Sequence, residues 1–284
     1  MKTVGILTKP KFPDVTHILK DLVAWLRERG KEVVLDGKTA ALIGEPAAYR
    51  TPQLAMLCDM VLVLGGDGTM LHAARLVEQR AVPILGVNMG GLGFLTEVSL
   101  EHLYPTLEKV FAGEFYLEER LMLRARIDRH GEHVAQATAL NDVVVSKGTL
   151  SRMIEMHLSI DGQFVTSLRG DGLIVSTPTG STAYSLSAGG PIINPSVQAF
   201  ILTPISPHTF THRPLLIPGS ARIEVLLASK DEGAMTTFDG QVGVAVTQGD
   251  TVTIGASDHR TRLIRFRDRT YYDVLRRKLK WGEG

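Results

Sequence analysis

The spacing of apolar runs changes near residue 118, and this change constrains the fold more than any other feature of the sequence. Before it, short apolar runs alternate with segments whose apolar residues recur every three or four positions, as on one face of a helix. The expected strands are residues 4–7, 32–35, 60–64 and 82–87, and the expected helices are residues 15–29 and 69–79. Strands that alternate with helices predict a parallel sheet of βαβ units.

After residue 118 the pattern becomes strand followed by strand. Residues 154–160 and 163–168 flank Asp161-Gly162, a strong signal for a type I′ hairpin turn. Further short strands are expected at residues 123–127, 225–227, 235–238, 242–246 and 251–254. This half of the chain therefore predicts a mainly antiparallel β-sandwich.

The sequence thus predicts two domains, an α/β domain with a parallel sheet and a β-rich sandwich. Their expected bounds are residues 1–117 and 118–268. A helical pattern in the last segment, residues 269–284, indicates a C-terminal helix that returns to the first domain.

Composition excludes several classes of protein. With 31 Lys plus Arg against 30 Asp plus Glu, the chain lacks the basic excess of nucleic-acid binders, so we expect no nucleic-acid partner. No apolar run reaches the ~18 residues of a membrane span, and no signal peptide is recognisable, so we expect no membrane partner. The lone Cys58 cannot form an internal disulfide. These features favour a soluble, cytoplasmic protein.

The sharpest motif is Gly65-Gly-Asp-Gly-Thr69, which follows an apolar strand and opens a helix. Such a turn presents backbone N–H groups and a helix N-terminus to phosphate. Because an acid beside phosphate requires a cation or a hydroxyl, Asp67 indicates phosphoryl transfer. A plain Gly-Asp-Gly turn is the alternative. The dinucleotide fingerprint, the Walker loop and the serine-hydrolase elbow all fail at an essential glycine.

Two further small-residue clusters accompany this motif. Residues 88–94, Asn-Met-Gly-Gly-Leu-Gly-Phe, follow the next strand and so lie on the same sheet edge as Asp67. Ligand contact and tight packing explain these glycines equally well. Residues 177–190 are rich in Thr, Ser, Ala and Gly and follow Arg169-Gly-Asp-Gly172, and their small hydroxylated side chains suit a nucleoside.

Taken in order, these motifs resemble the NAD kinase family over most of the chain. The resemblance rests on the Gly-Gly-Asp-Gly-Thr loop, the Asn141-Asp142 pair, the run from Asp171 to Tyr184 and the segment Thr203-Pro-Ile-Ser-Pro-His208. It implies an enzyme that moves the terminal phosphoryl group of ATP onto the adenosine ribose 2′-hydroxyl of NAD, giving NADP. The first domain would hold the phosphate donor and the catalytic loop, and the second would bind NAD.

By the same resemblance, Asp67 is the expected catalytic carboxylate. Many relatives have Glu where this chain has Asp142. The expected NAD and nucleotide contacts are Asp67, Gly68, His72, Asn141, Asp142, Arg152, Arg169, Asp171, Thr179, Thr182, Ala183, Tyr184, Ser185, Ser187, Ser206, His208 and Gln241. We also expect Mg²⁺, held mostly by nucleotide oxygens and water. A lipid or sugar kinase and a non-catalytic nucleotide sensor are the competing interpretations.

We further expect self-association as a dimer or tetramer. Residues 200–217 are apolar but interrupted by Pro204, Pro207 and Pro214, which argues against one long buried element and for an association surface. In the NAD kinase family, assembly brings parts of one subunit to the nucleotide site of another. Ser206 and His208 are the candidates here for reaching across.

Overall fold

The computed structural model describes residues 1–9, 12, 14–46, 51–91, 93–148, 152–209, 211–229 and 233–282. Leu92 and Phe210, which belong to two of the motifs above, lie outside the described residues. The chain divides into two compact units, which are described separately: unit 1 contains residues 1–119 and 260–284, and unit 2 contains residues 120–259. No helix among the described residues has the length and apolar character needed to cross a membrane.

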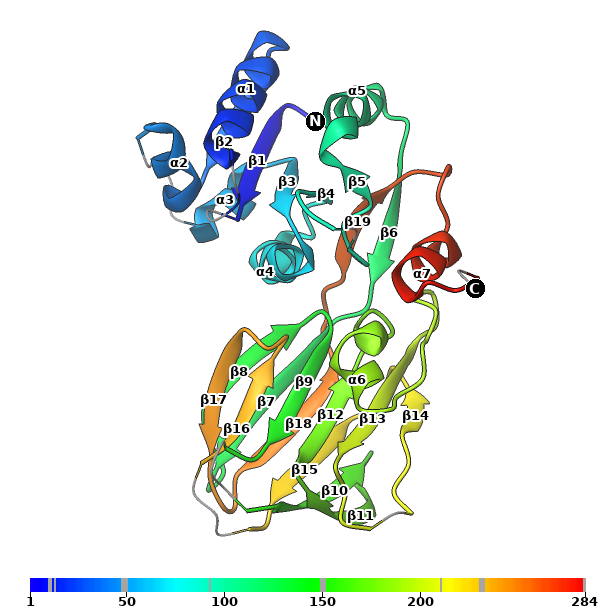
Figure 1. The fold of residues 1–284 in the computed structure, drawn as a ribbon. Helices are drawn as coiled ribbons and strands as arrows, with labels where there is room; N and C mark the ends of the chain where they lie inside the picture. The colour runs from blue at the N-terminus through cyan, green and yellow to red at the C-terminus, as the bar shows by residue number, and fades with distance from the viewer. Residues whose placement is uncertain are drawn as a thin grey trace. The chain divides into compact units, whose positions relative to one another are not determined.

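Unit 1 is built on one mostly parallel sheet (Figure 1). Over the described residues this sheet has seven strands, in the order β2 (Glu32–Leu35), β1 (Thr3–Thr8), β3 (Met60–Gly65), β4 (Ile84–Asn88), β19 (Thr261–Arg265) and β6 (Tyr116–Arg120), with β5 (Val98–Ser99) paired to β4. Strands β1, β3 and β4 are buried on both faces, as parallel strands covered by helices require. The α/β prediction for this part of the chain is therefore confirmed.

Unit 1 also contains helices, several of which cover this sheet with apolar faces. They are α1 (Val15–Glu28), α2 (Gly37–Ile43), α3 (Thr51–Leu57), α4 (Asp67–Val77), α5 (Leu103–Ala112) and α7 (Tyr271–Leu279), with short 3₁₀ turns at Glu78–Arg80 and Leu100–His102. Leu19, Leu22 and Leu26 of α1 are fully buried in one core with Ile6 and Leu62 of the sheet. The expected spacing of three and four residues therefore marks the packed face of α1.

The C-terminal return begins earlier than the sequence indicates. The second domain was expected to extend to residue 268, whereas the compact units divide the chain after His259. The reason is β19, which pairs in parallel with β4 at Leu263 and Ile84 and so belongs to the sheet of unit 1. A strand added from a distant part of the chain leaves no local sequence signal.

Unit 2 contains two antiparallel sheets (Figure 1). In the described part of the chain the first has the order β11 (Gln163–Gly170), β10 (Ile154–Ile160), β15 (Ile223–Leu227), β18 (Thr251–Ala256), β7 (Leu123–Arg129) and β8 (Glu132–Ala139). The second has the order β14 (Leu215–Pro218), β13 (Ala199–Ile205), β12 (Gly172–Ser176), β9 (Asp142–Ser146), β16 (Ala234–Phe238) and β17 (Val242–Val246). A 3₁₀ turn at Gly180–Thr182 and the short α6 (Tyr184–Ser187) follow β12.

One apolar core joins the two sheets of unit 2, with Met156 and Ile254 from the first and Phe200 and Phe238 from the second. This confirms the sandwich. The predicted hairpin also forms, since Ile160 pairs with Gln163 across Asp161 and Gly162, both at positive φ as a type I′ turn requires.

The prediction for residues 200–217 needs correction. Its apolar start is not surface: Phe200, Ile201 and Leu202 lie in the regular strand β13 and are 2% exposed or less. Pro204 does not prevent this strand from forming, because it lies near the end of β13. Exposed apolar side chains occur further on, at Leu215 and Leu216 of β14.

Candidate active site

Asp67 lies at the point where β3 gives way to α4. The strand ends at Gly65, Gly66 is the extended N-cap residue, and Asp67 is the first residue of the helix. The first N–H groups of a helix have no partner within it, so this terminus offers donors and the positive end of the helix dipole. Asp67 is half-buried and Gly68 is exposed. The motif therefore takes the strand-turn-helix geometry that the sequence predicts.

The carboxylate of Asp67 is held by the second glycine-rich turn. Its Oδ2 accepts the backbone N–H of Phe94 at 2.8 Å, and its Oδ1 accepts that of Leu95 at 3.0 Å. A Cβ atom at Gly93 would overlap Oδ1 of Asp67 and Oγ1 of Thr96, so glycine at residue 93 leaves the space that the carboxylate fills. At this position the packing interpretation of the glycine cluster holds.

The other glycines of this turn are less constrained. A Cβ atom at Gly90 would meet nothing within 4 Å. The buried Asn88 closes the turn, because its side chain accepts the N–H of Gly90 at 2.8 Å and donates to the carbonyl of Gly91 at 2.6 Å. This Asx-type closure fixes the path that leads to Gly93.

His72 lies on α4, one turn beyond Gly68, and its side chain is exposed. Partial desolvation of the ring by the surrounding protein, and then the charge of Arg75, lower the pKa of His72. A neutral imidazole can both donate and accept a hydrogen bond.

In unit 2, Asn141 lies in the tight connection between β8 and β9, and Asp142 is the first residue of β9. The carboxylate of Asp239 accepts three successive backbone N–H groups there, from Leu140 at 3.1 Å, Asn141 at 2.7 Å and Asp142 at 3.3 Å. Asp239 itself takes positive φ in the turn after β16. One carboxylate thus fixes the backbone that presents the Asn141 and Asp142 side chains.

Asp142 is buried, at 5% exposure. Burial and then the charge of Asp239 raise the pKa of its carboxyl to about 7. Desolvation disfavours the charged form, and a neighbouring carboxylate adds to that effect. Near neutral pH this group is therefore divided between a form that donates a hydrogen bond and one that only accepts.

The small-residue run from residue 177 packs directly on this connection. The hydroxyl of Thr177 donates to the carbonyl of Leu140 at 2.6 Å, and its N–H donates to that of Asn141 at 2.9 Å. A Cβ atom at Gly180 would overlap the Asn141 carbonyl, so only glycine fits there.

The candidate side chains of this run divide by exposure. Thr179 is buried and accepts from Arg120 at 3.3 Å, and Ser185 is buried with its hydroxyl 2.9 Å from that of Thr203. These two have structural partners. Tyr184 is 47% exposed and Ser187 is exposed, whereas Thr182 and Ala183 are half-buried. Gln241 is exposed in the turn after Asp239.

A second cluster lies around Asp171. Lys147 forms an ion pair with Asp171 at 3.0 Å, and the N–H of Asp171 donates to the carbonyl of Ile205. The N–H of His208 donates to the carbonyl of Arg169 at 2.9 Å, which brings Ser206 and His208 beside this group. Arg152 is exposed just before β10, whose first residue pairs with Gly170.

The two clusters of unit 2 lie at opposite ends of β12. Strand β12 begins after Asp171, and its last residue pairs with Asp142, so four residue steps, or about 13 Å, separate the two ends. All five residues of β12 are buried, so the strand itself offers no exposed side chain between the two clusters. Within a single chain, the candidate residues of unit 2 therefore form two separate groups.

In the described part of the chain, carboxylate and imidazole groups do not gather into a metal cage. Across the residues that the structure describes, no group of three or more His, Cys, Asp or Glu side chains could hold a metal ion. The lone Cys58 is buried, and this burial raises the pKa of its thiol to about 12, so it packs as an unreactive apolar residue.

Comparison with known proteins agrees with this geometry. Residues 4–115 match the family model of the ATP-NAD kinase N-terminal domain, and residues 140–266 match that of the C-terminal domain. The chain belongs to the ATP-NAD kinase family. It is 47% identical to the NAD kinase of Geobacter sulfurreducens over 283 residues, with 100% of both chains covered. It is also 47% identical to the NAD kinase of Syntrophotalea carbinolica, again over the whole of both chains.

Solved structures of NAD kinases share the fold. An NAD kinase from Archaeoglobus fulgidus, solved in complex with ATP, is 29% identical, with a TM-score of 0.77 and 99% of both chains covered. Yeast NADH kinase, solved with NADH, covers this whole chain at a TM-score of 0.92 and 24% identity, with 89% of that chain covered, and this likeness shows the fold alone. The resemblance inferred from the motifs, the enzyme class and the fold class are confirmed.

Sequence reasoning missed the groups that hold the site together. The sequence motifs do not include Asp239, and they give no role to the backbone N–H groups of Phe94 and Leu95. The only local signal at Asp239 is its Asp-Gly dipeptide, which indicates a turn but not the distant backbone that the carboxylate binds.

The glycine at residue 93 provides the first test of this arrangement. In Gly93→Ala, the added methyl must displace the Asp67 carboxylate or the turn, because it would overlap Oδ1 of Asp67. We expect a loss of about 1–3 kcal/mol in the free energy of unfolding, together with loss of NADP formation. Gly90→Ala is the matched control in the same turn, and thermal unfolding with a steady-state assay compares the two. Equal behaviour of both variants would contradict the packing argument.

The raised pKa of Asp142 predicts a specific pH dependence of stability. The folded pKa, about 7, exceeds the ordinary value of 3.8, so this group stabilises the fold fully below that value and loses its contribution as pH rises to about 7. Asp142→Asn removes the titration. We expect the free energy of unfolding to fall less steeply with pH in the variant, by up to about 1.4 kcal/mol per pH unit. Parallel curves from pH 4.5 to 8 in chemical denaturation would refute the assignment.

Proposed function

We propose that Asp67 is the catalytic carboxylate with which this NAD kinase moves the terminal phosphoryl group of ATP onto the adenosine ribose 2′-hydroxyl of NAD. The observation that carries the proposal is the fixed geometry of this side chain. Each oxygen accepts one backbone N–H, and each retains a lone pair for a further hydrogen bond. A carboxylate oriented in this way can accept the bond from an incoming hydroxyl without rotating.

Phosphoryl transfer requires positioning and charge stabilisation more than covalent work by the protein. We assign the donor phosphates to the N-terminus of α4, where Gly66 and Gly68 allow close backbone approach and the helix dipole favours negative charge. Asp67 then aligns the acceptor hydroxyl and takes its proton as the new oxygen–phosphorus bond forms, while the bond from the terminal phosphorus to its bridging oxygen breaks and ADP leaves.

Magnesium fits this chemistry as a group held mainly by the nucleotide. The absence of a three-ligand cage among the described residues agrees with an ion bound by phosphate oxygens, water and at most one or two carboxylates such as Asp67. When bound, it would neutralise charge on the donor phosphates.

The NAD contacts are assigned to the Asn141 cluster of unit 2. Asn141 offers a donor and an acceptor, and Asp142, with its pKa near 7, can do either for a ribose or base edge. The exposed ring of Tyr184 provides an apolar face for the nucleoside, with Thr182, Ala183, Ser187 and Gln241 around it.

Because the buried Cys58 makes no disulfide, we place the enzyme in the cytoplasm.

Asp67→Asn tests the catalytic assignment. The amide preserves size but loses the charge and one of the two N–H acceptors, so we expect kcat for NADP formation to fall by about 10²- to 10⁴-fold with little change in KM for NAD. Asp59→Asn is the control, because Asp59 also accepts two backbone N–H groups, from Lys2 and Thr3, at the other end of β3. A variant at residue 67 with wild-type kcat would remove Asp67 from catalysis.

We also propose that each NAD site is completed by a neighbouring copy of the chain, in a dimer or tetramer. Two observations support this. The Asp171 cluster lies at the opposite end of the buried β12 from the Asn141 cluster of its own chain. Ser206 and His208, the predicted crossing residues, are exposed beside Arg169 and Asp171. The cluster is therefore available to serve the site of a second copy.

Mixing two impaired variants tests this sharing directly. Asp67→Asn and Asp171→Asn are each expected to form a complete but weakly active assembly. After refolding together, a pair of chains that shares its sites regains one intact site in each mixed dimer, or about a quarter of wild-type activity with random pairing. Light scattering measures the assembly in parallel. Activity no higher than the mean of the two variants, or a fully active monomer, would overturn the shared-site proposal.

A further inference from the structure

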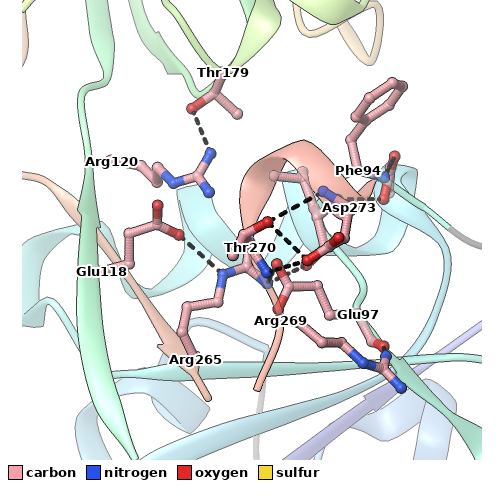
Figure 2. A network of polar contacts seen from close by, with 11 residues as sticks. Phe94, Glu97, Glu118, Arg120, Thr179, Arg265, Arg269, Thr270 and Asp273 are labelled. Carbon is pink, nitrogen blue, oxygen red and sulfur yellow. Dashed lines mark hydrogen bonds and ion pairs between the residues drawn. The ribbon is translucent and has the colours of Figure 1, made fainter. Parts of the chain in front are cut away.

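Arg265 is a buried cation at the end of β19, the strand that returns from the C-terminal part of the chain. Its side chain is 5% exposed, and its Nε and one terminal nitrogen meet acceptors from two other segments of unit 1, while the other terminal nitrogen is buried without a hydrogen-bond partner among the described residues (Figure 2). Nε donates to Glu118 of β6 at 2.9 Å. One terminal nitrogen donates to the carbonyl of Leu95 at 3.1 Å and lies 3.1 Å from Oε1 of Glu97.

The contact with Leu95 links Arg265 to the active site. Leu95 donates its N–H to Oδ1 of Asp67 and accepts from Arg265 through its carbonyl. A single residue of the turn therefore lies between the guanidinium and the carboxylate. Leu95 lies in neither a helix nor a strand, so no sheet ladder or helix fixes its orientation.

The same turn is held from the C-terminal segment at a second point. Arg269 donates to the carbonyl of Glu97 (Figure 2). Arg265 and Arg269 together bind the backbone on both sides of Thr96, whose side chain is fully buried next to the space left by Gly93. The backbone that presents the Phe94 and Leu95 N–H groups is thereby tied to residues about 170 positions later in the chain.

A guanidinium suits this task better than an ammonium. Its planar group directs several N–H donors at once, so carbonyl and carboxylate acceptors from separate segments can be held in one fixed arrangement. Burying a cation is costly, and here Glu97 and Glu118 supply the compensating charge. A Met or Leu would fill the same volume without orienting the Leu95 carbonyl.

We infer that Arg265 is a positioning residue for the phosphoryl-transfer step: through the Leu95 peptide it holds the two N–H groups that orient the Asp67 carboxylate. This inference rests on the proposed catalytic role of Asp67. It assigns an active-site task to the returning C-terminal segment, which no motif in the sequence indicates.

Steady-state kinetics of Arg265→Lys and Arg265→Met test the inference. We expect kcat to fall at least ~10-fold in Arg265→Met with KM for NAD and for ATP within about twofold, because misorientation of Asp67 affects the transition state and not substrate binding. Arg265→Lys should restore part of kcat, since an ammonium can still reach the Leu95 carbonyl. Arg262→Lys is the matched control, because Arg262 lies on the same strand and pairs with Glu119 at a more exposed site.

Amide hydrogen exchange gives a readout independent of activity. The Leu95 and Phe94 N–H groups should be protected in the wild type and in Arg262→Lys, and should exchange at least ~10-fold faster in Arg265→Lys. An unprotected Leu95 amide in the wild type would overturn the inference even if both Arg265 variants failed to fold.

A double substitution separates this inference from the proposed function. If Arg265 acts through Asp67, Arg265→Lys should lower kcat little further in the Asp67→Asn background. Wild-type kcat in Asp67→Asn would defeat the catalytic assignment itself. Loss of activity in Asp67→Asn with wild-type kcat and exchange in Arg265→Met would defeat only the role of Arg265.

Discussion

The hydrogen bonds from the Phe94 and Leu95 backbone to the Asp67 carboxylate are the constraint on which the candidate active site of unit 1 depends. They join the turns that follow two neighbouring parallel strands, β3 and β4, at the sheet edge where open α/β folds bind ligands. The requirement for glycine at residue 93 follows from this contact, because any larger residue would occupy the place of the carboxylate. One glycine of the second turn is therefore required by the position of the Asp67 carboxylate.

In unit 2, too, a carboxylate that accepts backbone N–H groups fixes the candidate site. There the Asp239 carboxylate accepts three backbone N–H groups and fixes the Asn141-Asp142 connection. The functional consequence differs because Asp239 is itself near a second carboxyl. Its charge, added to burial, raises the pKa of Asp142 to about 7 and leaves that side chain divided between two protonation states near neutral pH. A structural carboxylate thus also sets the hydrogen-bonding capacity of a candidate binding residue.

Much of the fold could be predicted from the sequence, because its signals are local. The period of apolar residues gave α1 and the alternation of βαβ units, and Asp161-Gly162 gave its hairpin. The errors arose where distant segments meet. Strand β19 pairs with β4, whose Ile84 lies 179 residues before Leu263, and β13 tolerates Pro204 near its end while its earlier residues fill the sandwich core. Neither fact has a signature within a short window of sequence.

The candidate residues also divide into features with a local sequence signal and features that depend on distant segments. Asp67 and Asn141 could be chosen as candidates because of the chemistry that their side chains can perform. Their orientation, however, depends on partners 27 and 98 positions away. An acid among glycines was interpreted as evidence of a cation or a hydroxyl nearby, yet two of its lone pairs bind the protein backbone. The remaining lone pairs are directed by that binding, so the structural bonds specify where an acceptor hydroxyl must lie. Holding the carboxylate and using it are therefore one requirement on the sequence, and Asp67, Gly93 and Arg265 all serve that requirement.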